Sequence, residues 1–389
     1  AAESLRKEGH QGRIVLIDRD TEMPYDRPPL SKEFISGEAE EDSVLLRNSS
    51  VYKQLDIELM LGAEITSVDP DEKKIETKNG QLFSWEKLML ATGSNLRKLT
   101  IEGDDLEGIF YLRTLADAKR MKKQLKNVEQ AVIVGAGFIG AELASSLKQL
   151  GIDVTIVEMA PYPMENIVGR KLSQYFLDLH RSHGVKVITE DSVARFHGNV
   201  TVEEAVTFGG RRIPCQAVII GVGVMPNTVI SHPQLQVERG YIVDEYGETS
   251  IPDIYAAGDC TSWPYNGTSI HVEHWDHAVN HGKTIAKNMI QSRSAPYVYT
   301  PYFWSDQYGG RFQYFGHTKE WSDTVMRGSM ADGEFTVFYL DDQQVVKAAF
   351  IANQPKNALS VRRMIKAQKP VDPGALLDDN VSLKKIIAS

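Results

Sequence analysis

The segment VIVGAGFIGAELASSLKQLGIDVTIVE, residues 132–158, constrains the fold of this chain more than any other stretch. Gly135, Gly137 and Gly140 form a GxGxxG pattern directly after a short apolar run that is typical of a buried strand. A helical pattern follows, and then a second strand-like run that ends at Glu158. This order predicts a Rossmann βαβ unit, which binds a dinucleotide. The apolar face of its helix is expected at Ile139, Leu143, Leu147 and Leu150.

Each part of this motif has a physical role in binding a dinucleotide. The first glycine makes the tight turn, the second lets the backbone approach the pyrophosphate, and the third allows close packing of helix and strand. The N-terminus of the helix supplies N–H groups and positive potential for the phosphates. Glu158 can accept both ribose hydroxyls and repels a 2′-phosphate, and the following MAPYPMEN contains no arginine to bind one. We therefore predict NADH rather than NADPH.

The rest of the chain has the pattern of an α/β protein. The runs RIVLID, KLMLATG, QAVIIGVG and DIYAAGD are rich in apolar residues, end at glycine or an acid, and alternate with helical patterns. From about residue 299 the pattern changes to antiparallel strands followed by a helix. We expect a parallel sheet in the first part and a separate α+β domain at the end.

Composition excludes several classes of protein. The net charge of −9 argues against nucleic-acid binding, which needs a surplus of basic residues. No apolar run reaches the roughly 20 residues that span a bilayer, so we expect no membrane segment. Cys215 and Cys260 are far apart and outside any CxxC pattern, which argues against disulfides, zinc knuckles and a redox-active pair. A reducing cytoplasm is the simplest setting.

Seven stretches resemble one family in their order along the chain: PYDRPPLSK, LMLATGS, YLRTLADA, GVGVMPNT, DIYAAGDC, HVEHWDHAVNHG and YFWSDQYGG. The family is that of the FAD-dependent NADH–ferredoxin and rubredoxin reductases, which includes putidaredoxin reductase and the reductases of aromatic-ring dioxygenases. Apoptosis-inducing factor is a relative. The resemblance implies a glutathione-reductase-type flavoprotein with two dinucleotide-binding domains and a C-terminal α+β domain, using FAD and NADH.

The resemblance also implies how the domains are arranged. The FAD domain is expected to be split around the NADH domain, and the C-terminal domain to close over the flavin. The predicted ranges are 1–112 for the first part of the FAD domain, 113–236 for the NADH domain, 237–297 for the second part of the FAD domain, and 298–389 for the C-terminal interface domain.

Individual site residues follow from the glycine motif and from the resemblance. The two catalytic candidates are Lys32 and Glu142, expected to form an ion pair that positions the nicotinamide, with Glu142 in the first turn of its helix. The helix opened by Glu273, His274 and Trp275 is expected to face the pyrimidine edge of the flavin. The full set of expected cofactor contacts is Asp18, Asp20, Arg27, Lys32, Thr92, Gly93, Arg113, Gly135, Gly137, Phe138, Ile139, Gly140, Glu158, Gly223, Gly258, Asp259, Glu273, His274, Trp275 and Trp304.

A weak internal repeat bears on the FAD site. LKQLGIDVTIVE, residues 147–158, parallels LRKEGHQGRIVLID, residues 5–18, once a two-residue insertion is allowed. The glycines that match the motif then fall before residue 1, so we expect roughly 20 residues with the FAD glycine loop to be absent from this chain and FAD to be held weakly. Because Arg19 stands where family members carry an acid, Asp18 or Asp20 is expected to bind the adenosine ribose, and the repeat favours Asp18.

Two clusters of charged or metal-binding residue types have plainer explanations. The four histidines of HVEHWDHAVNHG lie near helical spacing, but the family motif accounts for this stretch, so no metal is expected. The basic residues near the end of the chain are most often a solvated helix face, and a docking patch for an acidic iron–sulfur protein is the alternative. These basic residues are Arg362, Arg363, Lys366 and Lys369.

The function expected from these observations is hydride transfer from NADH to FAD, with single electrons passed on to a ferredoxin or rubredoxin. No cysteine follows Lys32 in the segment where disulfide and CoA-disulfide reductases carry theirs. Two alternatives remain: a redox-gated NADH-binding interaction protein like apoptosis-inducing factor, and an NADH reductase of a small acceptor such as a quinone, a radical or oxygen. The chain is expected to be a monomer or a homodimer.

Overall fold

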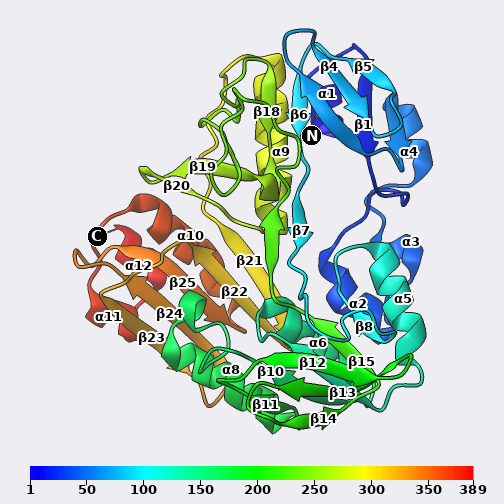
Figure 1. The fold of residues 1–389 in the computed structure, drawn as a ribbon. Coiled ribbons are helices and arrows are strands. Elements are labelled where there is room, and N and C mark those ends of the chain that lie inside the picture. Colours follow the sequence, from blue (N-terminus) through cyan, green and yellow to red (C-terminus); the bar gives the residue numbers. More distant parts are fainter. Residues whose placement is uncertain (389) are drawn as a thin grey trace. The chain divides into compact units, whose positions relative to one another are not determined.

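The computed structural model describes residues 1–388 of the chain. They form two compact units, each assembled from three separate parts of the sequence (Figure 1). Unit 1 comprises Ala1–Asp26, Asp42–Leu96 and Val224–Pro301, and unit 2 comprises Arg27–Glu41, Arg97–Gly223 and Tyr302–Ser389. Among the described residues, no helix is long and apolar enough to cross a membrane.

A five-stranded parallel sheet forms the first layer of unit 2 and confirms the predicted α/β class. Its strands are β8 (Ile109–Phe110), β9 (Gln130–Val134), β10 (Asp153–Val157), β11 (Lys186–Ile188) and β15 (Ala217–Ile220). They lie in the order β11-β10-β9-β15-β8, so the direction of winding reverses between β9 and β15. Ligands of such sheets bind at the carboxyl ends of the strands beside this reversal.

Helices and a small antiparallel sheet surround these strands. The helices are α5 (Leu115–Leu125), α6 (Phe138–Gln149), α7 (Glu165–Val168) and α8 (Arg170–Ser182), with η1 (Pro28–Ser31) and α2 (Glu33–Ser36) from the inserted segment. The antiparallel strands are β12 (Val193–Gly198), β13 (Val202–Thr207) and β14 (Arg212–Pro214).

The apolar face of α6 differs in part from the prediction. Leu143 and Leu147 are fully buried as expected, but Ile139 and Leu150 are 49% and 42% exposed. The buried stripe is completed by Gly140, Ala141 and Ala144, whose small size lets the helix lie close to the sheet. The prediction for Ile139 and Leu150 was therefore wrong, because the buried face of α6 is formed by Gly140, Ala141 and Ala144 together with the two leucines.

The C-terminal part of unit 2 is an antiparallel sheet, as the sequence predicts. Its strands are β21 (Tyr302–Gln307), β22 (Gly310–Gly316), β23 (Asp323–Ser329), β24 (Glu334–Leu340) and β25 (Val346–Ala352), in the order β21-β22-β25-β24-β23. The helices that follow are η3 (Pro355–Asn357), α10 (Ala358–Ala367), α11 (Pro373–Leu377) and α12 (Leu383–Ala388).

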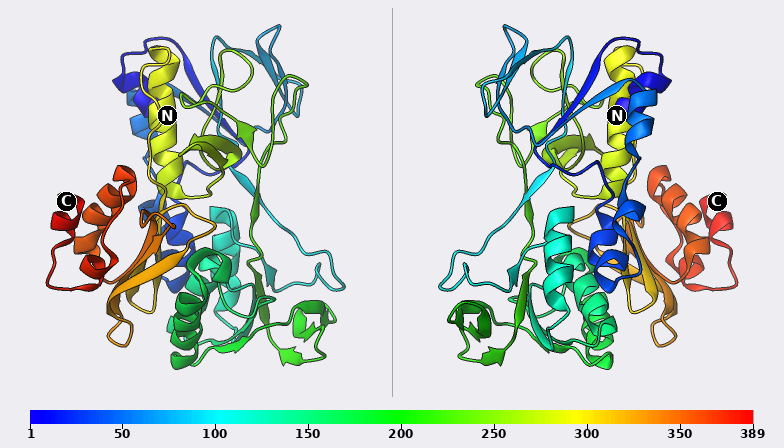
Figure 2. Two further views of the ribbon diagram at one scale, coloured as in Figure 1. Left: turned by 90° about the vertical axis from the view of Figure 1, so that its left-hand side faces the viewer. Right: turned by 90° about the vertical axis from the view of Figure 1, so that its right-hand side faces the viewer.

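Both faces of this sheet are buried. On one face, Phe315, Phe338 and Ile351 pack with Val361 and Ile365 of α10, which Figure 2 shows against the orange strands. On the other face, alternate residues of the same strands pack with α8 in a cluster that includes Leu172, Phe176, Phe312, Phe335 and Phe350. Alternation along each strand supplies the two apolar faces.

Unit 1 contains several short sheets, and one of its buried clusters is rich in aromatic residues, including Tyr241, Trp263 and Tyr297. Its strands are β1 (Ile14–Asp18), β2 (Ile57–Leu61), β3 (Ile65–Asp69), β4 (Lys74–Thr77), β5 (Leu82–Ser84), β6 (Leu88–Leu90), β7 (Ser94–Leu96), β16 (Val224–Pro226), β17 (Tyr241–Ile242), β18 (Ile254–Ala256), β19 (Thr261–Tyr265) and β20 (Thr268–Ile270). The pairs β1–β2 and β6–β18 are parallel. The helices are α1 (Ala2–Lys7), α4 (Ser49–Gln54), α9 (Trp275–Ile290) and η2 (Gly258–Cys260), while α3 (Glu41–Val44) joins the units.

Candidate functional site

The glycine turn of unit 2 has the geometry that a bound pyrophosphate needs. Gly135 has φ +98°, and a Cβ there would lie 2.6 Å from the carbonyl oxygen of Gly221. A Cβ at Gly140 would lie 2.3 Å from the carbonyl oxygen of Gly135, so only glycine lets the helix pack this closely. Gly137 is the N-cap of α6, and beyond its chain neighbours no atom lies within 4 Å of where its Cβ would stand. This open space beside the helix N-terminus fits a dinucleotide phosphate.

Glu158 stands at the carboxyl end of β10, where the ribose of such a dinucleotide lies. Its Oε2 accepts a hydrogen bond from the backbone N–H of Ala136 at 2.6 Å, inside the glycine turn. Its Oε1 accepts from the N–H of Ala160 at 2.8 Å. The carboxylate therefore ties the glycine turn to the loop after β10, and each oxygen keeps a lone pair for a further donor. The remaining lone pairs of this carboxylate can accept hydrogen bonds from the two hydroxyls of a ribose.

Lys32 and Glu142 form an ion pair inside unit 2, with 3.0 Å between Lys32 Nζ and Glu142 Oε2. Glu142 is only 2% exposed, and its carboxylate also accepts from the hydroxyls of Ser31 at 2.6 Å and Ser305 at 2.8 Å. Burial raises the pKa of the Glu142 carboxyl above its usual range, although Lys32 and the two hydroxyls oppose that rise. Lys32 and Glu142 therefore form a buried ion pair, in which Lys32, Ser31 and Ser305 all donate to the Glu142 carboxylate.

Glu142 lies further along its helix than the sequence predicts. The helix α6 begins at Phe138, directly after its N-cap Gly137, so Glu142 lies in the second turn and the prediction of the first turn was wrong. One turn later, Ser146 donates from its hydroxyl to the carbonyl oxygen of Ser31 at 2.8 Å. Residues 142 and 146 share one face of the helix and both hold the η1 segment.

The η1 segment brings other expected site residues together. Lys32 Nζ also donates to the carbonyl oxygen of Pro28 at 3.1 Å. The guanidinium of Arg27 donates to the carbonyl oxygen of Arg113, which precedes α5. Thr114 caps α5 through a capping box with Asp117, and this fixes the backbone beside Arg113. Unit 2 therefore gathers residues 27, 32, 113 and 142 with the glycine turn.

The remaining predicted residues of unit 2 are Phe138, Ile139, Gly223 and Trp304. Phe138 packs edge-on against Phe303, with ring centroids 4.7 Å apart. Trp304 is half-buried and stacks with Tyr302 at 5.9 Å between centroids. Gly223 has φ +93° and accepts at its carbonyl oxygen from the N–H of Arg97. Ile139 is exposed at the start of α6, which leaves it accessible to a bound cofactor.

In unit 1, two parallel strands end side by side at predicted site residues. The strand β6 leads to Thr92 and Gly93, and β18 leads to Gly258 and Asp259. Both glycines have positive φ, +67° and +77°, and Ser94 Oγ donates to Asp259 Oδ2 at 3.2 Å. Carboxylates and glycine turns at the carboxyl ends of parallel strands fit the polar chain of a flavin dinucleotide.

Asp18, the last residue of β1, and Asp20, two residues later, make different contacts. Asp20 accepts from the hydroxyl of Tyr25 at 2.8 Å and from the backbone N–H of Glu22 at 3.2 Å, so its carboxylate holds its own loop. Asp18 is exposed at the end of β1 and accepts from the N–H of Asp20 at 2.9 Å. The geometry favours Asp18 as the acid that is presented to a ribose.

The helix α9 begins two residues later than predicted. Trp275 is its first residue and His274 its N-cap, so Glu273 lies outside the helix. Glu273 instead accepts from Nε2 of His271 at 2.9 Å, and this contact draws its side chain away from the helix end. Trp275 Nε1 donates to Asp26 Oδ1 at 2.8 Å, a partner that the sequence did not predict.

Two buried histidines of α9 support the turn that carries Asp259. Nδ1 of His281 accepts from the backbone N–H of Gly258 at 3.2 Å, and Nδ1 of His277 lies 2.9 Å from the hydroxyl of Tyr297. Burial lowers the pKa of His281 to about 3 and that of His277 well below its usual range, so both rings are neutral. Within residues 1–388, no group of three or more His, Cys, Asp or Glu is arranged to hold a metal ion.

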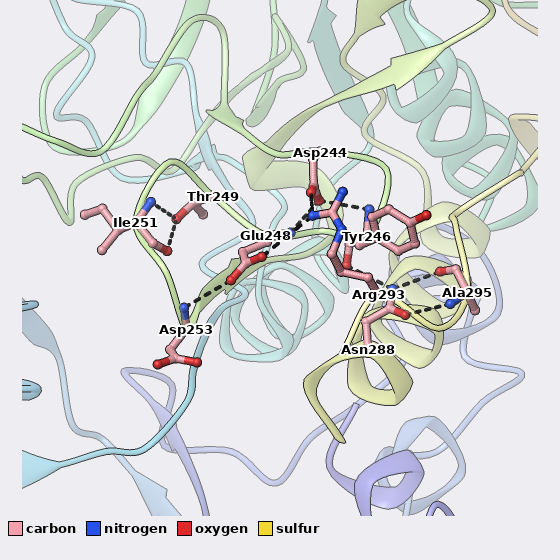
Figure 3. A network of polar contacts seen from close by, with 9 residues as sticks. All are labelled: Asp244, Tyr246, Glu248, Thr249, Ile251, Asp253, Asn288, Arg293 and Ala295. Atoms are coloured by element: carbon pink, nitrogen blue, oxygen red, sulfur yellow. Dashed lines mark hydrogen bonds and ion pairs between the residues drawn. The ribbon is translucent and has the colours of Figure 1, made fainter. Parts of the chain in front are cut away.

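The far end of α9 is braced by a polar network, drawn in Figure 3. Asn288 donates from Nδ2 to the carbonyl oxygens of Tyr246 at 3.0 Å and Ala295 at 2.9 Å. Arg293 donates to Asp244 Oδ2 at 2.6 Å, and its guanidinium lies 4.1 Å above the ring of Tyr246. These contacts hold the loop that precedes β18, so the C-terminal end of α9 helps to fix the strand that leads to Asp259.

Three residues that sequence reasoning missed complete the site of unit 2. Ser31 and Ser305 bind the Glu142 carboxylate, and Gln307 Nε2 donates to the hydroxyl of Ser305 at 3.0 Å. A signal was present, since all three lie inside the family-like stretches PYDRPPLSK and YFWSDQYGG. In the second stretch, residues 305 and 307 alternate on one face of a strand.

Comparison with known proteins covers nearly the whole chain. A family model described as pyridine nucleotide-disulphide oxidoreductase matches residues 1–282, and one described as reductase C-terminal matches residues 302–387. Putidaredoxin reductase of Pseudomonas putida is 31% identical over 394 residues, covering 99% of this chain and 93% of that protein. The ferredoxin reductase subunit of 5,5'-dehydrodivanillate O-demethylase from Sphingobium sp. is 35% identical over 401 residues, covering 100% of this chain and 95% of that protein. The crystal structure of the covalent putidaredoxin reductase–putidaredoxin complex matches with a TM-score of 0.95 and 31% identity, over 100% of this chain and 94% of that one.

Proposed function

Because the chain belongs to the pyridine nucleotide-disulphide oxidoreductase family and carries a reductase C-terminal domain, we propose that it is an NADH-dependent reductase of a ferredoxin or rubredoxin. The similar proteins whose names include ferredoxin or rubredoxin reductase support this acceptor class. FAD, when bound, takes up an electron pair as hydride and releases electrons singly, which is what an iron–sulfur acceptor requires. The observation that carries the proposal is the buried Lys32–Glu142 pair on the helix of the NADH motif.

In this proposal, each unit holds one cofactor. The glycine turn and Glu158 hold NADH, while Lys32 and Glu142 orient the nicotinamide by presenting a fixed pair of charges beside α6. The FAD-binding set proposed for unit 1 is Asp18, Thr92, Gly93, Gly258, Asp259 and the start of α9 at Trp275. Three further residues expected to contact a cofactor, Arg27, Arg113 and Trp304, belong to unit 2.

The choice of NADH over NADPH rests on Glu158 and can be tested by removing its charge. Glu158→Gln is expected to raise the ratio of kcat/KM for NADPH over NADH at least 10-fold, because a neutral amide no longer repels a 2′-phosphate. Steady-state kinetics with both nucleotides measure the ratio. The matched control is Glu190→Gln, which neutralises an exposed acid whose N–H binds the carbonyl oxygen of Ala160. A ratio that stays at its wild-type value in Glu158→Gln contradicts this assignment.

The acceptor proposal is tested by comparing acceptors and by altering the basic residues in α10 and just after it. Arg363, Lys366 and Lys369 are exposed, whereas the Arg362 guanidinium lies 5.5 Å from the ring centroids of both Tyr302 and Phe315. The exposed three therefore form the docking patch that we propose for an acidic iron–sulfur protein. Changing all three to glutamine is expected to slow the reduction of an acidic ferredoxin about 10-fold at low salt, because steering charges act on the association rate.

Ferricyanide reduction by the same triple variant is the control and is expected to be unchanged. An unaltered ferredoxin rate at low salt excludes the patch. Fast turnover with quinones or oxygen and slow turnover with every ferredoxin and rubredoxin favours the small-acceptor alternative. A long-lived reduced-flavin–NAD⁺ complex with negligible electron transfer to any acceptor favours the interaction-protein alternative.

Two further expectations belong to the proposal. The first is the division into 1–112 and 237–297 for FAD, 113–236 for NADH and 298–389 for the interface domain. The second is a cytoplasmic setting, supported by Cys215 and Cys260, which are both buried thiols outside any disulfide.

A further inference from the structure

The carboxylate of Glu142 is held at both oxygens, but by different parts of unit 2. Its Oε2 receives Lys32 Nζ at 3.0 Å and the hydroxyl of Ser31 at 2.6 Å, both from the η1 segment and the residue after it. Its Oε1 receives the hydroxyl of Ser305 at 2.8 Å, from β21 of the C-terminal sheet. Without Ser305, Oε1 would lose the donor that the structure gives it in a site from which water is almost excluded.

The direction of the hydrogen bond from Ser305 is set by its other neighbour. Gln307 Nε2 donates to the oxygen of Ser305 at 3.0 Å, so the single hydroxyl proton of Ser305 is left for Glu142. Ser305 and Gln307 are 0% and 1% exposed, and as residues i and i+2 of one strand they face the same way. The hydroxyl is not needed by the sheet itself, since Ser305 pairs with Phe312 through the backbone.

The charged group that acts on this carboxylate is Lys32. Among the other titratable groups near α6, Asp306 lies on the opposite face of β21, with its Oδ1 4.0 Å from Nε of Arg311. His180 of α8 bonds to the hydroxyl of Tyr308, and its pKa of about 4 keeps it neutral. The hydroxyls of Ser31 and Ser305 therefore set the orientation of the Glu142 carboxylate relative to Lys32.

We propose that Ser305, oriented by Gln307, is a positioning residue that fixes the Glu142 carboxylate against Lys32. The C-terminal sheet thus sets the geometry of the ion pair from a strand far away in sequence, at a separation of 163 residues. This inference rests on the proposed role of the pair in orienting the nicotinamide, but the placement of the carboxylate can be measured without turnover.

The test follows the carboxyl group of Glu142 by infrared difference spectroscopy of the flavin-loaded protein during a pH titration. The band of Glu142 is identified as the one lost in Glu142→Gln. In Ser305→Ala the titration midpoint is expected to rise by about one pH unit, because the lost hydrogen bond favoured the charged form. Ser305→Thr, which keeps a hydroxyl, is expected to restore the midpoint.

Thr336→Val is the matched control, because it removes a fully buried hydroxyl of the same sheet that binds Gln354 and not Glu142. Its midpoint is expected to equal that of the wild type. If Ser305→Ala does not fold, Gln307→Met is expected to shift the midpoint in the same direction by a smaller amount. An unshifted midpoint in a folded Ser305→Ala, or in Gln307→Met where that variant is used, overturns the proposal.

Rates separate this inference from the function on which it rests. In single turnovers, Ser305→Ala is expected to slow flavin reduction several-fold while the apparent Kd for NADH stays constant, because nucleotide binding depends on the glycine turn. A shifted midpoint in Ser305→Ala, together with unchanged rates in Ser305→Ala and in the Glu142 variants, supports the positioning role and contradicts the proposed role of the pair. An unshifted midpoint in Ser305→Ala, together with slowed flavin reduction in the Glu142 variants, contradicts only the positioning role.

Discussion

Glu142→Ala is expected to slow the reduction of bound flavin by NADH about 100-fold, because small errors in the placement of a reacting ring have effects of this size. The variant removes the counter-ion of Lys32, whose side chain is only 11% exposed. Breaking a buried ion pair from one side leaves an uncompensated charge, which costs about 3–5 kcal/mol of stability. Stopped-flow absorbance of the flavin and thermal unfolding measure the two effects.

Two further variants show whether the slower flavin reduction comes from the lost charge of Glu142 or from its lost shape. Glu142→Gln keeps the volume and an acceptor oxygen but removes the charge, so we expect a rate between that of the wild type and that of Glu142→Ala. Glu129→Gln neutralises an exposed carboxylate of the same unit and is expected to change nothing. The affinity for NAD⁺ is expected to stay within about twofold in all three, because the glycine turn is intact. Flavin reduction at the wild-type rate in Glu142→Ala would remove the pair from the mechanism.

The protein is expected to lose a large part of its stability between pH 6.5 and pH 4. Burial lowers the pKa of His180 from 6.5 to about 4 and that of His281 to about 3, so the fold binds fewer protons than the unfolded chain. Depressed pKa values give stability that is complete above pH 6.5 and is lost as the pH falls toward the folded-state values. At pH 4 each histidine accounts for a loss of about 3 kcal/mol, against a typical total of about 5–15 kcal/mol.

Urea unfolding at pH 7.5, 6.0, 5.0 and 4.5 measures this loss. His180→Gln is expected to have a flatter pH profile than the wild type, because it has no ring to protonate. His183→Gln is the control, since that ring is exposed and stacks on Tyr308 at 4.0 Å between centroids. Asp191, with a pKa lowered to about 2, acts only below pH 4 and lies outside this window. Equal urea midpoints from pH 7.5 to 4.5 contradict the assignment.

The parts of the fold that were predictable from sequence are those set by local chain geometry. A side chain at Gly135 or Gly140 would collide with the backbone, and the space beside Gly137 is open. Because each position in the turn favours glycine, the spacing of the three glycines identifies the turn. The parallel and antiparallel sheets were predictable for a similar reason, since strand-like runs and their connections carry the topology.

The parts that were not predictable depend on tertiary contacts. Ser305 and Gln307 reach Glu142 only because the C-terminal sheet packs on α6, and nothing local in YFWSDQYGG indicates that partner. The start of α9 was misplaced by two residues because His271 binds Glu273, and such competition at helix ends has a weak signal in sequence. Helical spacing predicts Ile139 on the buried face, but it is 49% exposed, and Gly140 is the residue that packs closely.

The burial of the C-terminal sheet on two faces has a consequence for how modular this chain is. Phe312, Phe335 and Phe350 pack against Phe176 of α8, so removing the sheet exposes a large apolar surface on α8. The C-terminal sheet and the part of unit 2 that contains α8 are therefore expected to unfold in one cooperative transition. A C-terminal domain grafted from a relative would have to bring aromatic residues that match α8. The sequences of the C-terminal domain and of α8 are therefore constrained to change together in evolution.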